Sequence, residues 1–168
     1  MSPVKFSSGR AVLLLTRCAL GGVFLYAAWT KLSQPWALFA MSINAYQLLP
    51  EWSVTLLART LPWAELALGA LLIAGWALRM AATIASILLA GFFAVMLRSF
   101  LAGNTGIDCG CFGVGEALSG QTLLRDAALG MLSFGLTLAA FRENKNRADA
   151  PAAQPAAFAA GEAGETAK

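Results

Sequence analysis

Two cysteines one residue apart are the sequence feature with the clearest potential for chemistry. Cys109 and Cys111 flank Gly110 in a glycine-rich stretch, directly after Asp108. Two neighbouring thiols can form a disulfide or exchange one with a partner protein. Gly110 supplies the backbone freedom that so small a ring requires, and a strained ring of this kind is typical of labile, catalytic disulfides. The spacing therefore predicts a redox-active pair.

Two other interpretations of the cysteine pair stay open. A static disulfide would pin the loop, although closing a very short loop removes little chain entropy. A metal site would need further ligands, because two thiolates and Asp108 do not complete a tetrahedral site without a partner protein. We therefore predict no metal, and exchange of disulfides remains the favoured interpretation.

Arginines near the cysteines are the next candidates. Positive charge favours the reactive thiolate, and Arg98 and Arg125 are expected at the level of the cysteine loop, within reach of Arg59. We predict that Arg98 and Arg125 stabilise the thiolates. The alternative is that each arginine only extends its side chain to the lipid headgroups.

Glu65 is the other charge that calls for an explanation. It lies in the middle of an apolar stretch, one turn after Pro62, where an ionised carboxylate must pair, take up a proton or line a polar cavity. We expect Arg17 to be its partner. The two interpretations are a structural ion pair and a proton-carrying or quinone-facing role.

The composition indicates which elements must position these residues. The chain of 168 residues is 58% hydrophobic, 12% charged and contains no histidine, whereas soluble domains average about 25% charged residues. This excludes a nucleic-acid-binding protein, despite the net charge of +3. It also excludes mechanisms that need imidazole, such as Ser-His-Asp catalysis or a histidine-bound zinc.

Four stretches are long and apolar enough to cross a bilayer, which takes about 20 residues each. The sequence thus predicts an all-α, integral membrane four-helix bundle, with a short helix from Trp36 to Leu48 along the interface. The first stretch is expected to be a retained helix and not a signal peptide. The expected spans are residues 11–30, 53–78, 80–101 and 122–141.

The lysines and arginines predict the orientation. Six of them fall on the side of the two termini (Lys5, Arg10, Arg79, Arg142, Lys145 and Arg147), which by the positive-inside rule is the cytoplasmic side. We therefore predict a cytoplasmic N-terminus over residues 1–10 and a membrane domain over residues 11–141. Its cysteine loop, residues 102–120, would face the periplasm across a bacterial inner membrane. Residues 142–168 are predicted to be a disordered cytoplasmic tail.

Several local motifs together carry a family resemblance over about residues 10–141. They are the stretches Gly22–Lys31, Tyr46–Pro50 and Leu61–Leu66, and Asp108–Gly113 combined with Arg125-Asp126. With these motifs the chain resembles the MauE family of methylamine utilisation membrane proteins, within the DoxX-like superfamily.

The resemblance implies a role in methylamine metabolism, in the maturation of a periplasmic enzyme. The implied client is the small, disulfide-rich subunit of methylamine dehydrogenase, and the implied helper is a thioredoxin-like periplasmic protein. Only Cys109 and Cys111 carry over as candidate catalytic residues. No cofactor is certain, and a quinone is one candidate electron acceptor.

Three other functions remain open at this stage. One is a non-catalytic membrane assembly factor or scaffold, in which the cysteines only form a clip. Another is a quinone-linked oxidoreductase of sulfur compounds, of the DoxX type. The third is a small transporter, with Glu65 and Arg17 lining its path.

Overall fold

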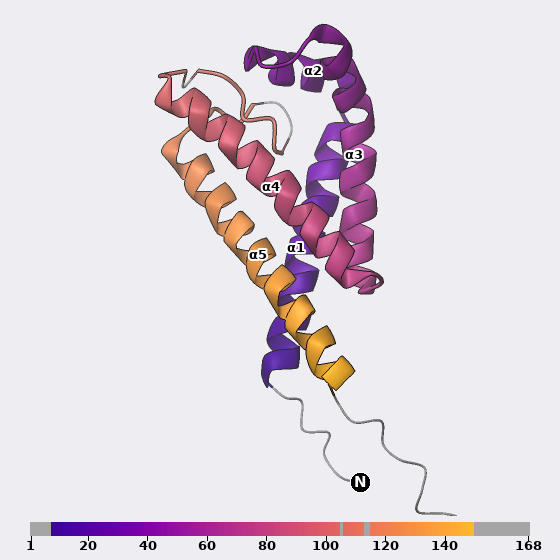
Figure 1. Cartoon of the computed structure of the whole chain (residues 1–168). Helices are drawn as coiled ribbons and strands as arrows, with labels where there is room; N and C mark the ends of the chain where they lie inside the picture. The colour runs from indigo at the N-terminus through magenta and orange to yellow at the C-terminus, as the bar shows by residue number, and fades with distance from the viewer. Residues whose placement is uncertain (1–7, 105, 113–114, 150–168) are drawn as a thin grey trace, which may run out of the picture.

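The fold is all-α, as predicted. The computed structural model describes residues 8–104, 106–112 and 115–149, and describes side chains within residues 11–142. Its helices are α1 (Ser8–Leu32), α2 (Trp36–Ala45), α3 (Glu51–Ala74), α4 (Leu78–Leu101) and α5 (Gly120–Asp149) (Figure 1). In the described part of the chain the only β-type pairing is one isolated bridge.

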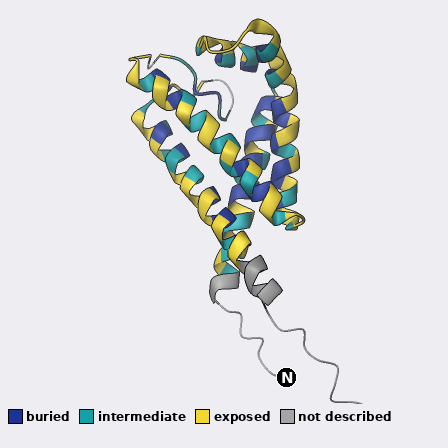
Figure 2. Cartoon of the chain, in the orientation of Figure 1, coloured by how far each residue is buried: buried dark blue, intermediate teal, exposed yellow. Residues whose placement is uncertain are grey.

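The four long helices have the length and composition of membrane spans, as the sequence predicts. The spans are Ala11–Leu32, Glu51–Ala74, Leu78–Leu101 and Gly120–Arg142. Large apolar side chains on them are exposed, for example Trp63 at 61% and Ile87 at 67%. Exposed positions run along the long helices (Figure 2). A water-soluble protein would bury such a surface, whereas a bilayer solvates it.

Two boundaries differ from the prediction by more than three residues. The second span was expected to reach residue 78 but ends at Ala74, because Gly75 adopts a left-handed conformation (φ 73°) that caps the helix. The last helix was expected to end at residue 141 but continues to Asp149. Residues 142–149 are therefore helical and not part of a disordered tail, because residues such as Arg142 are good helix formers that extend a helix into water. The rest of the expected tail, residues 150–168, lies outside the described residues, as do residues 1–7.

Close contacts join the helices in two pairs. In α1 and α3, a Cβ added to Gly21 or to Gly69 would lie 2.9 Å from the other residue's carbonyl oxygen, so these backbones approach as only glycine permits. In α4 and α5, Ser86 Oγ lies 2.9 Å from Ser133 Oγ and 3.0 Å from Thr137 Oγ1. The apolar core joins the two pairs through Leu20, Phe24, Leu68, Leu72, Ala82, Ala85 and Leu136.

The ends of the bundle differ in character. The beginning of α1 and the end of α5 lie at one end, whereas α2 and the loop between α4 and α5 lie at the other (Figure 1). The short helix predicted over 36–48 is α2, which begins at Trp36 and ends at Ala45. The cysteine loop and α2 therefore share the end of the bundle opposite the beginning of α1 and the end of α5.

Candidate functional site

The cysteine loop folds back on itself. Asp108 forms an antiparallel bridge with Ala117, and the backbone N–H of Cys109 donates to the carbonyl of Glu116 at 2.8 Å. The Asp108 carboxylate accepts a hydrogen bond from the N–H of Gly115 at 3.3 Å. This pairing places the side chain of Glu116 next to Cys109, although seven residues separate them in the sequence.

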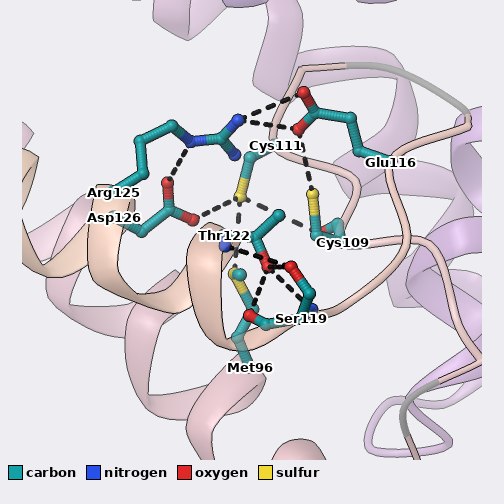
Figure 3. Close-up of polar contacts among 8 residues, drawn as sticks. All are labelled: Met96, Cys109, Cys111, Glu116, Ser119, Thr122, Arg125 and Asp126. Atoms are coloured by element: carbon teal, nitrogen blue, oxygen red, sulfur yellow. Dashed lines mark hydrogen bonds and ion pairs between the residues drawn. The ribbon is translucent and has the colours of Figure 1, made fainter.

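The start of α5 is fixed by a reciprocal cap. The hydroxyl of Thr122 accepts a hydrogen bond from the N–H of Ser119 at 2.9 Å, and the hydroxyl of Ser119 accepts one from the N–H of Thr122 at 3.3 Å. Such a cap satisfies backbone donors that have no partner within the first helical turn. It positions Arg125 and Asp126, one turn later, against the cysteine loop (Figure 3).

Each cysteine faces a carboxylate, and both are free thiols. Cys111 Sγ lies 3.2 Å from Asp126 Oδ2 and 3.5 Å from Met96 Sδ. Cys109 Sγ lies 3.6 Å from Glu116 Oε2. Cys109 is buried and Cys111 is partly exposed, and the two side chains with their carboxylate partners are drawn in Figure 3.

Arg125 connects the two carboxylates. Its Nη1 lies 2.9 Å from Glu116 Oε2, and its Nε lies 3.2 Å from Asp126 Oδ1. The guanidinium also lies over the ring of Phe112, 4.4 Å from the centroid. The structure therefore places Arg125 at the site, where it is joined to the carboxylate that each thiol faces.

The pKa values of the two thiols are shifted in opposite directions. A hydrogen bond from the Cys111 thiol lowers the pKa of Cys109 to about 7, against the opposing effect of burial. The same hydrogen bond, together with burial and the negative charge of Asp126, raises the pKa of Cys111. Near neutral pH Cys109 is therefore about half ionised, and its thiolate accepts a hydrogen bond from Cys111, which stays protonated.

This asymmetry predicts the pH dependence of alkylation. Because only the thiolate reacts, and the pKa of Cys109 is lowered to about 7, its reaction with iodoacetamide should level off above that pH. Below it the rate should fall about tenfold per pH unit. Mass spectrometry of the cysteine peptides in a Cys18→Ser background measures both sites.

The control is Cys111→Ala, which removes the thiol that donates to Cys109. In that variant the midpoint should rise, because the Cys109 thiolate loses the hydrogen bond that stabilises it. A wild-type midpoint near the ordinary thiol value of about 8.5 would contradict the asymmetry.

Tyr46 ties α2 to the cysteine loop. Its hydroxyl donates to the backbone carbonyls of Asp108 at 3.3 Å and Cys109 at 3.2 Å. Burial and the acidic groups around it raise the pKa of Tyr46, so it remains a hydrogen-bond donor at physiological pH. Sequence reasoning missed Tyr46, Glu116 and Met96 as neighbours of the cysteines. Only Glu116 carried a signal, since it and Asp108 are the acidic residues of the 102–119 loop.

Of the three arginines expected near the cysteines, only Arg125 is brought to them by the described contacts. Arg98 is exposed near the end of α4, and no described hydrogen bond or ion pair joins its side chain to the cluster in Figure 3. The guanidinium of Arg59 lies 4.5 Å from the ring centroid of Trp36. This stacking holds Arg59 against α2.

The expected pairing of Glu65 with Arg17 is wrong. Glu65 Oε1 lies 2.5 Å from Lys31 Nζ, and both side chains are buried. The Gly21–Gly69 contact sets a register in which Arg17 lies against Gly75 at the carboxyl end of α3. Ten residues of helix separate Gly75 from Glu65, about 15 Å. Arg17 therefore meets the negative end of the α3 dipole instead of Glu65.

The surroundings of Glu65 connect it to the cysteines. Lys31 Nζ also lies 5.1 Å from the ring centroid of Phe39 in α2, so the ion pair joins three helices. Glu65 Oε2 is buried and has no hydrogen-bond partner among the described residues. A cavity of about 30 Å³ is lined by Glu65, Cys111 and Asp126, enough space for about two water molecules.

Comparison with known proteins identifies the family. The family model described as "Methylamine utilisation protein MauE" matches residues 9–140. The chain is 32% identical to the methylamine utilization protein MauE of Methylorubrum extorquens, over 80% of this chain and 69% of the relative. It is 30% identical to that of Paracoccus denitrificans, over 91% of this chain and 77% of the relative.

No solved structure matches this chain at a significant level. The family match nevertheless covers the first three spans, the cysteine loop and all but the last two residues of the fourth span. The chain therefore belongs to the MauE family of methylamine utilisation proteins, and its four apolar spans make it a multi-pass membrane protein.

Proposed function

We propose that this chain supports methylamine utilisation by thiol–disulfide exchange at Cys109 and Cys111. The client would be a periplasmic enzyme that acquires disulfides as it matures, in particular the small subunit of methylamine dehydrogenase. A thioredoxin-like periplasmic protein would carry the exchange between them. The observation that supports this proposal best is the asymmetric pair, in which the pKa of Cys109 is lowered to about 7 beside a protonated Cys111.

The burial of the two residues suggests the order of the exchange. In the oxidised pair a partner thiolate attacks the sulfur of Cys111, the more exposed of the two residues, and Cys109 leaves as a thiolate because thiols of lower pKa leave faster. The partner's second thiolate then attacks its own sulfur in the mixed disulfide and releases Cys111. The partner loses two electrons and gains a disulfide, while the pair gains two electrons and Cys111 regains a proton next to Asp126.

The proposed roles of the other site residues follow from their contacts. Arg125 holds Glu116 and Asp126 in place beside the two thiols, and Asp126 is positioned to exchange a proton with Cys111. Glu65 would carry protons through the small cavity that it shares with Cys111 and Asp126. Arg98, exposed outside the described cluster, would act only through the charge it adds at this end of the bundle.

The proposed location is the bacterial inner membrane, with both termini in the cytoplasm. The end of the bundle that carries α2 and the cysteine loop would then face the periplasm (Figure 1). Thiols on that side meet oxidising conditions and secreted partners.

A stable mixed disulfide is the direct test of this proposal. In Cys109→Ser, Cys111 keeps its partial exposure but has no neighbouring thiol, and the partner is used with its second cysteine replaced by serine, so that neither side can resolve a mixed disulfide. After mild oxidation with diamide, which replaces the oxidising equivalents of the missing Cys109–Cys111 disulfide, we expect this variant to accumulate a covalent complex with the thioredoxin-like protein on non-reducing gels. Cys111→Ser should trap much less, because Cys109 is buried at 2% exposure.

Cys18→Ser serves as the matched control for the trapping experiment. Cys18 is a free cysteine in α1, and its replacement should leave the yield of the complex unchanged. Equal trapping by both single variants would contradict the assigned order. Absence of any complex in Cys109→Ser would contradict exchange itself and favour the scaffold.

A further inference from the structure

A larger cavity lies on the other side of the cysteine loop. It has a volume of about 380 Å³ and lies between α2, α3, α4 and the loop, within the size range of small-molecule sites. We call it the α2–α4 cavity. Its wall is almost entirely apolar, and the residues used below are Phe39, Tyr46, Gly91, Phe92, Cys109 and Gly110.

The cavity reaches the side of the bundle within a membrane span. Ile87 and Gly91 line it from α4, and both are exposed on the outer face of that helix. Both lie well inside the span Leu78–Leu101. A ligand dissolved in the hydrocarbon can therefore reach the cavity sideways, without passing through water.

One residue of the redox pair, Cys109, lines this cavity. Gly110 also lines it, and a Cβ added to Gly110 would lie 3.7 Å from Phe39 Cε2, so the loop backbone packs directly on α2. Tyr46 supplies a hydroxyl at the same place, 3.2 Å from the carbonyl oxygen of Cys109. The cavity thus combines an apolar, aromatic wall with one cysteine of the redox pair.

We propose that the α2–α4 cavity binds a lipid-soluble quinone, which reoxidises the Cys109–Cys111 pair. This inference rests on the proposed function, because it names the oxidant of the same pair. A quinone fits all three features: it partitions into hydrocarbon, its flat ring packs against aromatic side chains such as Phe39 and Phe92, and it accepts two electrons. A phospholipid acyl chain would satisfy only the apolar wall.

The redox step balances with these participants. The Cys109 thiolate and the Cys111 thiol lose two electrons and form a disulfide, and the quinone gains two electrons and two protons to become a quinol. One proton comes from the Cys111 thiol by way of Asp126, which lies 3.2 Å away. The second comes from water and replaces the proton that Cys109 loses when it ionises.

The test uses the purified full-length chain in nanodiscs, reduced beforehand, with a short-chain ubiquinone as the probe. We expect loss of quinone absorbance with one quinol formed for each disulfide. The informative variant is Gly91→Leu, since a Cβ at Gly91 meets open space and leucine is a better helix former than glycine. Filling the cavity this way should slow quinol formation by about tenfold or more.

The matched control is Gly130→Leu. Gly130 also offers open space for a Cβ, lies in α5 and is not among the residues that line the α2–α4 cavity. This variant should reduce quinone at the wild-type rate. In both variants the alkylation of Cys109 by iodoacetamide should keep its pH dependence, which shows that the loop is intact.

Three outcomes would overturn the inference. The reduced wild-type pair could leave ubiquinone unreacted, or Gly91→Leu could reduce it at the wild-type rate. Alternatively, native mass spectrometry could show phospholipid in the cavity that ubiquinone does not displace. If mixed disulfides with the thioredoxin-like partner still form in any of these cases, the proposed function stands and only the quinone site fails.

Discussion

Replacing Cys109 and Cys111 together by serine should reduce disulfide formation in the maturing enzyme to the rate seen in cells that lack this protein. A hydroxyl forms no bond equivalent to a disulfide, so both the proposed exchange with the partner and the reoxidation of the pair are lost. The loop should keep its fold, because the Asp108–Ala117 bridge and the Tyr46 hydrogen bonds do not involve the sulfurs. The measurement is the fraction of the client's cysteines that alkylate with time after synthesis.

The control for this experiment is Cys18→Ser, at equal amounts of protein in the membrane. It should leave the maturation rate unchanged. If the double variant also matures the client at the normal rate, the redox proposal is wrong and the protein acts as an assembly scaffold.

Replacing Lys31 alone by methionine should produce the largest loss of stability in the chain. Glu65, at 4% exposure, would keep a buried carboxylate without its ammonium partner. Breaking a buried ion pair from one side costs about 3–5 kcal/mol of unfolding free energy, whereas replacing both partners by apolar residues is often close to neutral. The double variant Lys31→Met/Glu65→Leu should therefore recover most of the lost stability. Unfolding in mixed detergent micelles, followed by circular dichroism, measures all three proteins.

The double variant also separates the two roles of Glu65. If it is stable and its cysteine pair still reduces quinone at the wild-type rate, the ion pair is structural and the proton role is excluded. If it is stable but quinol formation is slow, Glu65 carries protons through the cavity it shares with Cys111 and Asp126. A double variant as unstable as Lys31→Met would contradict the ion-pair interpretation itself.

The sequence predicts the architecture well because the membrane imposes it. A span must be apolar over its whole length, so hydropathy alone locates all four long helices to within a few residues. The exceptions have local causes. At Gly75 the left-handed conformation ends α3 earlier than the hydrophobic pattern does, and after Phe141 the helix continues because nothing in the polar residues stops it.

Only those residues of the candidate site that the local sequence motif contains could be predicted. Cys109, Cys111 and Arg125 follow from their types and their places relative to the spans. Glu116 reaches Cys109 through a backbone pairing that depends on the conformation of the loop. Tyr46 reaches it from a separate helix. Neither contact can be inferred from the spacing of residues along the chain.

The partner of Glu65 was predicted wrongly because register cannot be read from composition. Arg17 was expected to pair with Glu65 because it is a long cationic side chain in a neighbouring span. The depth at which two helices meet is set by their closest contact, here between Gly21 and Gly69. That contact moves Arg17 to Gly75 and leaves Glu65 to Lys31.

The position of Arg125 between two carboxylates makes the two sulfurs interdependent. One guanidinium serves both Glu116 and Asp126, and each of these faces a different cysteine. A shift of the guanidinium toward one carboxylate weakens its hold on the other, so a change of charge at either sulfur alters the electrostatic environment of its neighbour. The two thiols therefore titrate as a coupled pair, whose macroscopic pKa values belong to the pair and not to either cysteine. We expect a substitution at any one of these three charged residues to change the pKa of both cysteines.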